Sequence, residues 1–246
     1  MKRSTAFSIA ALVLMTLSLP ASGQIIDDPT KWVQLPDMEN GFDQQSQWDP
    51  SDNEPNLVKA DDWQCLDGLP VTDIHWWGSY FNNVPFEPGD LQGFAILIYA
   101  DTEIGPDVWG PGTLLEDYFV PLDDANETEY GTDCEGETVY QYSWDLDPWF
   151  SQDILSWYWV SIVAVTPGIG NTPVWGWHTG FGGPGSEPAV KGLVPVDSAI
   201  PEGNPEMWQV VDYDFAFALT TVPEPGTLAI LGLSALGLLT LRRKNK

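Results

Sequence analysis

The chain has 246 residues, with 36 acidic residues against nine Lys and Arg and a formal net charge of −27 at pH 7. Six of the nine basic residues lie at the two ends, so the region 24–222 keeps three lysines against 35 of the 36 acids. A field of this sign repels phosphate, which excludes nucleic acid as a partner and favours cations. The 13 Trp, 10 Phe and 8 Tyr are enough to build a core, which excludes a disordered acidic chain.

The first 23 residues predict a secretory signal peptide. Lys2 and Arg3 supply positive charge, an apolar run extends from Ala6 to Leu19, and small residues precede Gln24. The alternative is a first transmembrane helix, but the apolar run is short and Pro20 follows it. We therefore expect an N-terminal helix that is removed before Gln24 and export of the rest of the chain.

The middle of the chain repeats short runs of aromatic and β-branched residues, separated by Gly, Pro, Asp and Asn. Inside these runs the side chains alternate with a period of two, as in "VYQYSWDL", where Tyr140, Tyr142 and Trp144 share one face. The predicted strands are Leu57–Gln64, Val71–Phe81, Gly93–Ala100, Leu114–Pro121, Thr138–Asp145, Trp157–Val165, Val174–Thr179 and Trp208–Thr220.

This pattern predicts an all-β fold, an antiparallel β-sandwich of jelly-roll type. We expect the sandwich over residues 57–222, with residues 24–56 as an irregular lead-in packed on it. Stretches dense in Pro and Gly, chiefly 167–203 apart from "VWGWHTG", read as surface loops.

The chain has two cysteines, Cys65 and Cys134. In an exported chain an even number of cysteines predicts a disulfide, with two free buried thiols as the alternative. A disulfide that closes the loop between Cys65 and Cys134 would stabilise the fold by about 4 kcal/mol in the chain-entropy model.

Three kinds of polar site have candidates. His75 and His178, with an acid, have the residue types of a zinc site or a general base, but their spacing matches no metal motif and structural histidines are the alternative. Carboxylate pairs such as Asp61-Asp62 are too numerous to indicate a glycosidase, so we expect no enzyme activity and name no catalytic residue. Calcium fits better, because oxygen ligands gather on the loop 121–137, with a solvated acidic loop as the alternative. The calcium ligands proposed there are Asp123, Asp124, Asn126, Glu127 and Asp133, with Glu129 close by.

Tryptophans beside Gly, Pro or loop positions are candidates for stacking against sugar rings, since the apolar face of a pyranose packs on an indole. Core packing is the alternative for each of them, although 13 Trp are many for one core. The proposed glycan contacts are Trp76, Trp77, Trp175 and Trp177, with Trp109 and Trp149 as further candidates.

The end of the chain has three consecutive parts: "VPEP" at 222–225, an apolar run at 226–241, and "RRKNK". The apolar run is shorter than the roughly 20 residues of a stable transmembrane helix, so we expect a single helix that holds the chain in the inner membrane transiently. The basic residues would stay on the cytoplasmic side. A plain C-terminal anchor is the alternative.

This arrangement at residues 223–246 resembles the PEP-CTERM sorting signal of Gram-negative bacteria. The resemblance implies that an exosortase, a membrane-embedded transpeptidase-like enzyme, cuts near the Pro-Glu-Pro and passes the protein to the cell surface or the exopolysaccharide matrix. It also implies the residues of the signal, which are Pro223, Glu224 and Pro225, followed by the basic Arg242, Arg243 and Lys244.

A second resemblance covers most of the region before this tail. "KWVQLPD", "ADDWQC", "VTDIHWWGSYF", "GFAILIYAD" and "WGWHTG" are similar to an uncharacterised domain found beside PEP-CTERM tails in environmental bacteria. That family has no established activity, so the resemblance implies one all-β unit and no catalytic residue.

These observations favour a secreted, acidic structural or adhesion protein of the cell surface or biofilm matrix, which binds exopolysaccharide. We expect no required cofactor; calcium would bind only if the loop 121–137 is a calcium site. The alternative is a secreted carbohydrate-active hydrolase.

Overall fold

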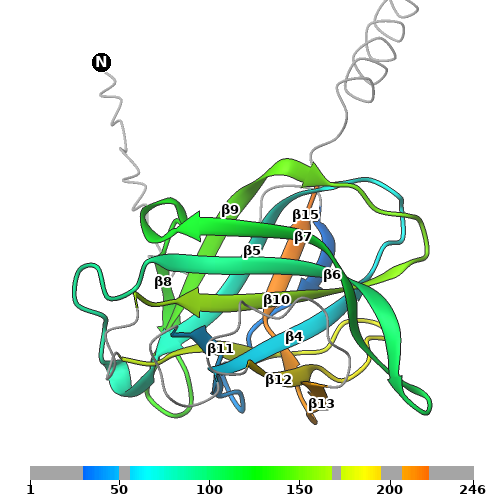
Figure 1. Ribbon diagram of the computed structural model, residues 1–246. Helices are drawn as coiled ribbons and strands as arrows, with labels where there is room; N and C mark the ends of the chain where they lie inside the picture. The colour runs from blue at the N-terminus through cyan, green and yellow to red at the C-terminus, as the bar shows by residue number, and fades with distance from the viewer. Residues whose placement is uncertain (1–29, 50–55, 168–172, 195–206, 222–246) are drawn as a thin grey trace, which may run out of the picture.

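The computed structural model describes residues 30–49, 56–167, 173–194 and 207–221 (Figure 1). The signal peptide and the two terminal helices that the sequence predicts, and the sorting segment at 223–246, lie outside the described residues. The all-β prediction is confirmed, because the described residues form strands with two short 3₁₀ turns, η1 (Phe81–Asn83) and η2 (Leu122–Asp124). None of the described helical segments is long and apolar enough to cross a membrane.

Two packed sheets make up the described fold. The first has eight strands among the described residues: β1 (Thr30–Gln34), β2 (Asp43–Gln45), β5 (Val71–Tyr80), β8 (Thr128–Thr132), β9 (Thr138–Phe150), β11 (Trp175–Gly180), β14 (Asp214–Phe215) and β15 (Phe217–Thr220). The second has seven: β3 (Gln47–Trp48), β4 (Asn56–Gln64), β6 (Gly93–Gly105), β7 (Val108–Pro121), β10 (Trp157–Val165), β12 (Val190–Val194) and β13 (Trp208–Val210).

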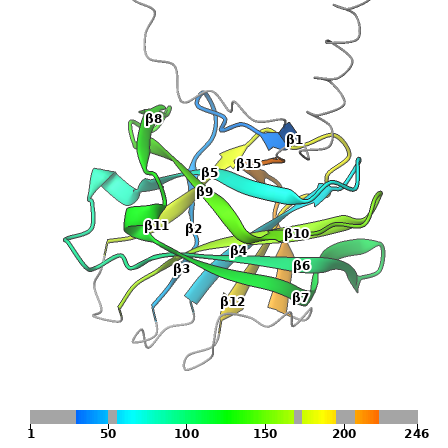
Figure 2. The ribbon, with the colours of Figure 1, turned by 90° about the horizontal axis from the view of Figure 1, so that it is seen from above.

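The strand order brings segments together that are far apart in the sequence. The first sheet runs β1-β15-β5-β11-β14, with β9 beside β5, β8 beside β9 and β2 beside β11. The second runs β13-β12-β4-β10-β6-β7, with β3 beside β10. The pairs formed by described strands are antiparallel, apart from β3 with β10. In Figure 1 the strands β7, β6, β10 and β4 lie in front of β9, β5 and β15, and Figure 2 shows the two sheets from above.

Aromatic side chains fill the space between the sheets. Trp76 of β5 stacks on Tyr142 of β9, with ring centroids 5.4 Å apart, and meets Phe94 of β6 edge-on at 5.3 Å. Trp175 of β11 also contacts Phe94, at 5.0 Å. Because these contacts join strands of both sheets, they form the centre of the sandwich core.

Two expectations about the elements were wrong. The segment 24–56 is not an irregular lead-in where it is described, because it contributes β1 and β2 to the first sheet and β3 to the second. The range Trp208–Thr220 is not one strand, because β13 belongs to the second sheet whereas β14 and β15 belong to the first. The chain crosses between the sheets at residues 211–213.

The predicted disulfide is also wrong, since both cysteines are free. Cys65 is buried at the end of β4, where its sulfur accepts a hydrogen bond from the Gly68 amide. Cys134 is exposed in the turn between β8 and β9, and its thiol donates to the Gly41 carbonyl. The two thiols lie in different parts of the sandwich. The even number of cysteines therefore did not indicate a disulfide in this protein.

Candidate functional site

A cavity of about 320 Å³ opens on the second sheet. The sheet supplies Asp62 from β4, Asp101 from β6, Trp109 from β7 and Trp157 from β10, and the loop before β12 supplies Gly185 and Glu187. Trp109 is 42 % exposed. The cavity therefore combines three carboxyl groups with two indole rings, one of which is exposed to solvent.

The sheet register explains why these residues meet. In β10, Trp159 lies opposite Asp62 of β4 and also opposite Tyr99 of β6, so the neighbouring Asp101 comes close to the same place. The Trp159 indole donates a hydrogen bond of 2.7 Å to Asp101 Oδ1, and the Glu187 amide donates one of 3.1 Å to Asp62 Oδ2. These bonds fix two of the carboxyl groups at the cavity.

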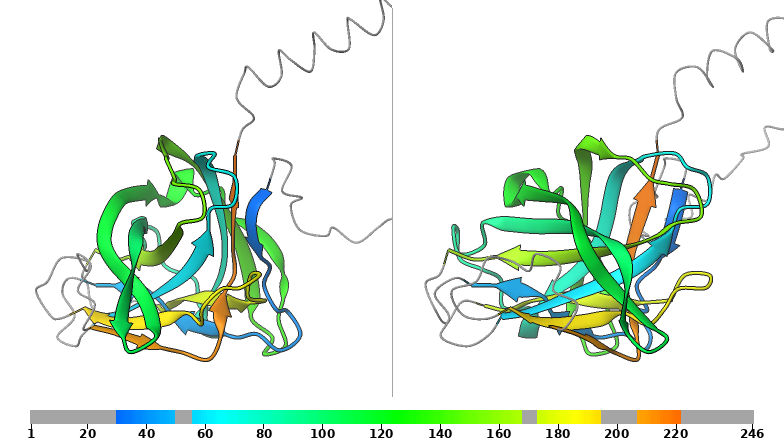
Figure 3. Two further views of the ribbon diagram at one scale, coloured as in Figure 1. Left: turned by 90° about the vertical axis from the view of Figure 1, so that its right-hand side faces the viewer. Right: turned by 45° about the vertical axis from the view of Figure 1, so that its right-hand side comes forward.

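Trp109 is the second residue of β7 and therefore lies close to the turn of the β6–β7 hairpin. The pairing of β6 with β7 shifts register at three places between Ile98 and Gly105. Such irregularities increase the local twist, and the outer part of the hairpin twists away from the rest of the sheet (Figure 3).

A second, more open cavity of about 600 Å³ adjoins the first and shares Asp101 and Trp157 with it. Glu116, Asp153 and Tyr158 are among the residues that line it. Since the two cavities have a wall in common, we treat them together as one groove, called the acid–indole groove below.

Burial changes the protonation of the groove. It raises the pKa of Asp62 to about 8, and the charges of Asp214, Asp101 and Glu187 add to this, against the hydrogen bond from the Glu187 amide. Burial and the charge of Glu187 also raise the pKa of Asp101. At neutral pH the Asp62 carboxyl therefore keeps its proton, and its Oδ1 has no hydrogen-bond partner among the described residues.

Asp61, the neighbour of Asp62 in β4, is fully buried below the groove. Burial first, and then the charges of Asp214 and Asp62, raise its pKa well above the usual range. Its oxygens accept hydrogen bonds from the Gln34 side chain and from the amides of Phe215 and Asp62. Asp61 thus joins β4 to both β1 and β14.

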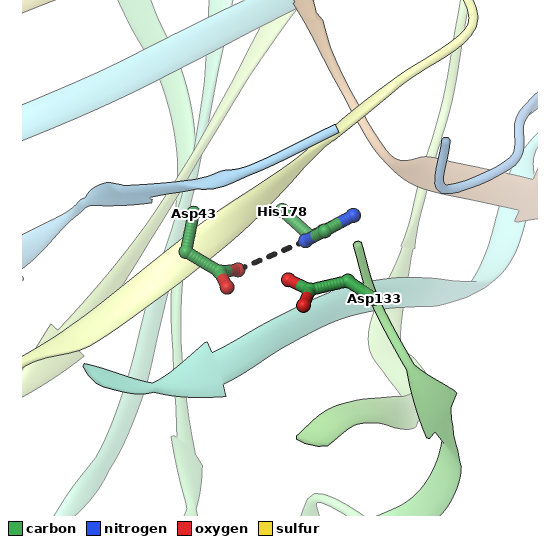
Figure 4. Close-up of side chains that lie close together, drawn as sticks. All are labelled: Asp43, Asp133 and His178. Carbon is green, nitrogen blue, oxygen red and sulfur yellow. Dashed lines mark hydrogen bonds and ion pairs between the residues drawn. The ribbon is translucent and has the colours of Figure 1, made fainter. Parts of the chain in front are cut away.

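A separate cluster lies in the first sheet and consists of Asp43 of β2, Asp133 of the β8–β9 turn and His178 of β11 (Figure 4). Each residue offers one donor atom, and these atoms lie within 4.8 Å of one another. His178 Nδ1 is 3.1 Å from Asp43 Oδ1, and Nε2 is 3.4 Å from the Asp37 carbonyl oxygen. All three residues are buried.

The cluster is strongly acidic. Burial alone would lower the pKa of His178, but the hydrogen bond and charge of Asp43 outweigh burial and raise it. The pKa of Glu137 is raised by burial and by the charges of Asp43 and Asp133. Glu137 is therefore a fourth titratable group close to the cluster.

The proposed calcium ligands do not come together. Asp123 and Asp124 are exposed on η2, the Asn126 amide donates to the Ser143 carbonyl, and Glu127 accepts a hydrogen bond from the Tyr80 hydroxyl. In the part of the chain that is described, the acids of this loop form no group of three with converging oxygens, and only Asp133 enters such a group, with partners outside the loop.

The two histidines do not share a site. The His75 ring lies 3.5 Å from Asp73 Oδ2 and 3.5 Å from the Gln141 amide, whereas His178 belongs to the cluster with Asp43. A zinc site built on both imidazoles is therefore wrong.

The four proposed glycan contacts are wrong as well, because the side chains are buried in the core. The exposed fractions of Trp76, Trp77, Trp175 and Trp177 are at most 1 %. Trp109 and Trp149 are the exposed tryptophans among the described residues, at 42 % and 56 %. Of these two, Trp109 lines the groove.

Sequence reasoning missed Asp43, Asp101, Trp157 and Glu187 as site residues. Asp101 directly follows the apolar run 94–100 of β6, and this interruption is a usable signal for a polar position within the strand. Glu187 and Asp43 carry no such signal, since only the register and a loop conformation bring them to their sites.

The described residues define an all-β protein with curled antiparallel sheets. A family model described as a domain of unknown function, DUF7901, matches residues 30–220, so the chain belongs to that family. The PEP-CTERM protein-sorting motif matches residues 221–244, which marks the chain as an exported substrate of an exosortase. Searches of curated proteins and of solved structures found no match.

Proposed function

We propose that the domain binds a neutral or amino-sugar polysaccharide in the acid–indole groove, at the cell surface or in the exopolysaccharide matrix. One observation carries the proposal: the exposed Trp109 and the partly buried Trp157 line the same cavity as three carboxyl groups. Indole rings stack on the apolar faces of sugars, and a few polar groups around an apolar surface fix the orientation of a ligand.

The carboxyl groups of the groove have complementary roles. Asp62, whose pKa is about 8, is buried at the wall of the groove and keeps its proton at neutral pH, so it adds no negative charge there. Asp101 and Glu187 accept hydrogen bonds from hydroxyl or ammonium groups. A polysaccharide rich in uronic acids is disfavoured, because region 24–222 holds 35 acids against three lysines.

The sorting motif supports a location outside the cytoplasm. Exosortase substrates are exported and processed at the membrane, so the groove would meet polysaccharide there. We propose that the domain then stays at the surface or in the matrix, where polysaccharide is available.

A hydrolase is the second candidate, and the raised pKa of Asp62 favours it. A glycosidase needs one carboxyl group that is protonated at working pH beside a second that is ionised. Asp62 meets the first requirement, and Asp101 and Glu187 are the other carboxyl groups that line the same cavity. Release of reducing ends that stops in Asp62→Asn would select the hydrolase, and binding without release selects the binding protein.

The test is co-sedimentation of the full chain, in mild detergent, with the exopolysaccharide of its producer. We expect Trp109→Ala to weaken binding about fivefold, because one stacking contact is worth roughly 1 kcal/mol. Trp149→Ala is the matched control, since it removes an exposed indole that does not line the groove. Equal binding by both variants would refute the proposed groove.

A further inference from the structure

The cluster of Asp43, Asp133 and His178 contains two carboxylate oxygens without a partner. Asp43 Oδ2 and Asp133 Oδ2 are buried and accept no hydrogen bond within the described residues. Buried carboxylate oxygens without a partner are costly, and buried charges normally pair or coordinate a metal. The donor atoms of the three residues converge to within 4.8 Å of one another.

We propose that Asp43, Asp133 and His178 bind a divalent transition-metal ion of the Zn²⁺ type. Such ions hold nitrogen and oxygen donors at about 2.0 to 2.2 Å, so neighbouring donors lie roughly 3 to 4 Å apart. The spacing of Nδ1 and Oδ1 in the His178–Asp43 pair, 3.1 Å, already falls in this range.

Other hydrogen bonds hold the donors in place. Asp133 Oδ1 accepts from the amides of Glu135 and Glu137, at 3.0 and 2.9 Å, which directs Oδ2 away from the turn. The Asp37 carbonyl lies beside His178 Nε2 and leaves Nδ1 facing Asp43. Gly41 gives the ring room, because a Cβ there would lie 2.9 Å from Nε2. Partners that orient the ligands in this way are typical of metal sites.

The charge balance favours a cation. Two carboxylates face one imidazole. The lysines of the described residues lie elsewhere: Lys31 pairs with Asp67, and Lys59 lies opposite Lys191 in the second sheet. The chain has no Arg between residues 24 and 222.

The donor set selects the kind of ion. Calcium takes six to eight oxygen ligands, whereas this cluster offers an imidazole and a small number of carboxylates. Imidazole with carboxylate suits Zn²⁺ and its neighbours in the first transition row. The proposed ion would join β2, β11 and the β8–β9 turn, so its role is to hold the turn on the first sheet.

The experiment measures metal binding by the full chain in mild detergent, after chelator treatment and removal of the chelator. We expect one Zn²⁺ retained per chain through gel filtration, a rise of about 5 °C in Tm, and a visible absorption band with Co²⁺. Calcium at the same concentration should give none of these changes. A chain that retains no Zn²⁺, or that calcium stabilises through Asp133, would overturn the proposal.

Asp133→Asn is the decisive variant, because its side-chain oxygen still accepts the two turn amides while the second oxygen is replaced. We expect Zn²⁺ affinity to fall at least about 100-fold with the circular dichroism spectrum unchanged. If Asp133→Asn does not fold, Asp43→Asn tests the same loss of Zn²⁺ affinity. The matched control is Asp123→Asn with Asp124→Asn, which removes exposed charges from the neighbouring segment. Equal Zn²⁺ binding by Asp133→Asn and this control would refute the site.

Discussion

The two sheets each bury a group of carboxylates, and they do so in different ways. In the second sheet, Asp61 and Asp62 receive amide hydrogen bonds, and burial raises their pKa values so that Asp62 is neutral at pH 7. In the first sheet, Asp43 and Asp133 stand beside an imidazole, and each keeps one oxygen without a partner in the described structure. Asp62 Oδ1 likewise has no partner among the described residues, but a proton neutralises the Asp62 carboxyl, whereas we propose that a metal ion neutralises the second group. The comparison shows that burial of an acid alone does not define a metal site.

The largest expected effect is a loss of stability when Asp61 of the second sheet is replaced. Asp61→Ala removes the acceptor of three donors, those of Gln34, Phe215 and Asp62, and leaves them buried. Each unsatisfied donor costs about 1 to 3 kcal/mol, so we expect the free energy of unfolding to fall by about 3 to 5 kcal/mol. Urea denaturation of the two proteins measures this. A loss below about 1 kcal/mol would show that Asp61 does not join the sheets.

The next effect tests the neutral state of Asp62. Its pKa is about 8 in the folded protein and 3.8 as the reference value, so the folded state holds the proton more tightly. Its contribution to stability is complete below pH 3.8 and is lost as the pH rises toward 8. In Asp62→Asn this loss is absent, so we expect its Tm to exceed that of the unchanged protein by about 5 °C at pH 8, but hardly at pH 4.

Melting curves across this pH range check the prediction. Glu116→Gln, which changes another acid of the groove, is the control and should melt like the unchanged protein at both ends of the range. A parallel pH dependence in Asp62→Asn would mean that other groups cause it.

The smallest effect concerns the thiols and leaves stability unchanged. Cys134 is exposed and Cys65 is buried, and neither forms a disulfide. We expect alkylation without reductant to label one cysteine in the folded protein and two after denaturation, as counted by mass spectrometry. If neither cysteine were labelled in denaturant, the two cysteines would form a disulfide after all.

Much of the fold was predictable, because the buried central strands have a clear period of two. Trp157–Val165 was predicted with the bounds of β10, and this strand pairs on both sides in the second sheet. The strand β8, "TEYGT", was missed because its residues are exposed or half-buried and show no alternation. The strand β12, "VKGLV", was missed because it lies in a stretch dense in Gly and Pro.

The positions of the tryptophans were not predictable from their neighbours. Glycine beside tryptophan suggested exposed loops, but several glycines make room for indole rings. A Cβ at Gly78 would collide with the ring of Trp175, and one at Gly183 with the ring of Trp32. The cluster of Asp43 and His178 was hidden for another reason, since 135 residues separate the pair in the sequence and only the pairing of β2 with β11 brings them together.

The place of β15 has a mechanical consequence. This strand ends at Thr220, next to the sorting motif at 221–244, and it lies between β1 and β5 in the first sheet. A pull on the tail along the strand therefore loads the hydrogen bonds to both neighbours in shear, because ladder bonds run perpendicular to the strands. All of these bonds share the force instead of breaking one after another. A tether at this end of the domain would therefore load a strand that is paired on both sides.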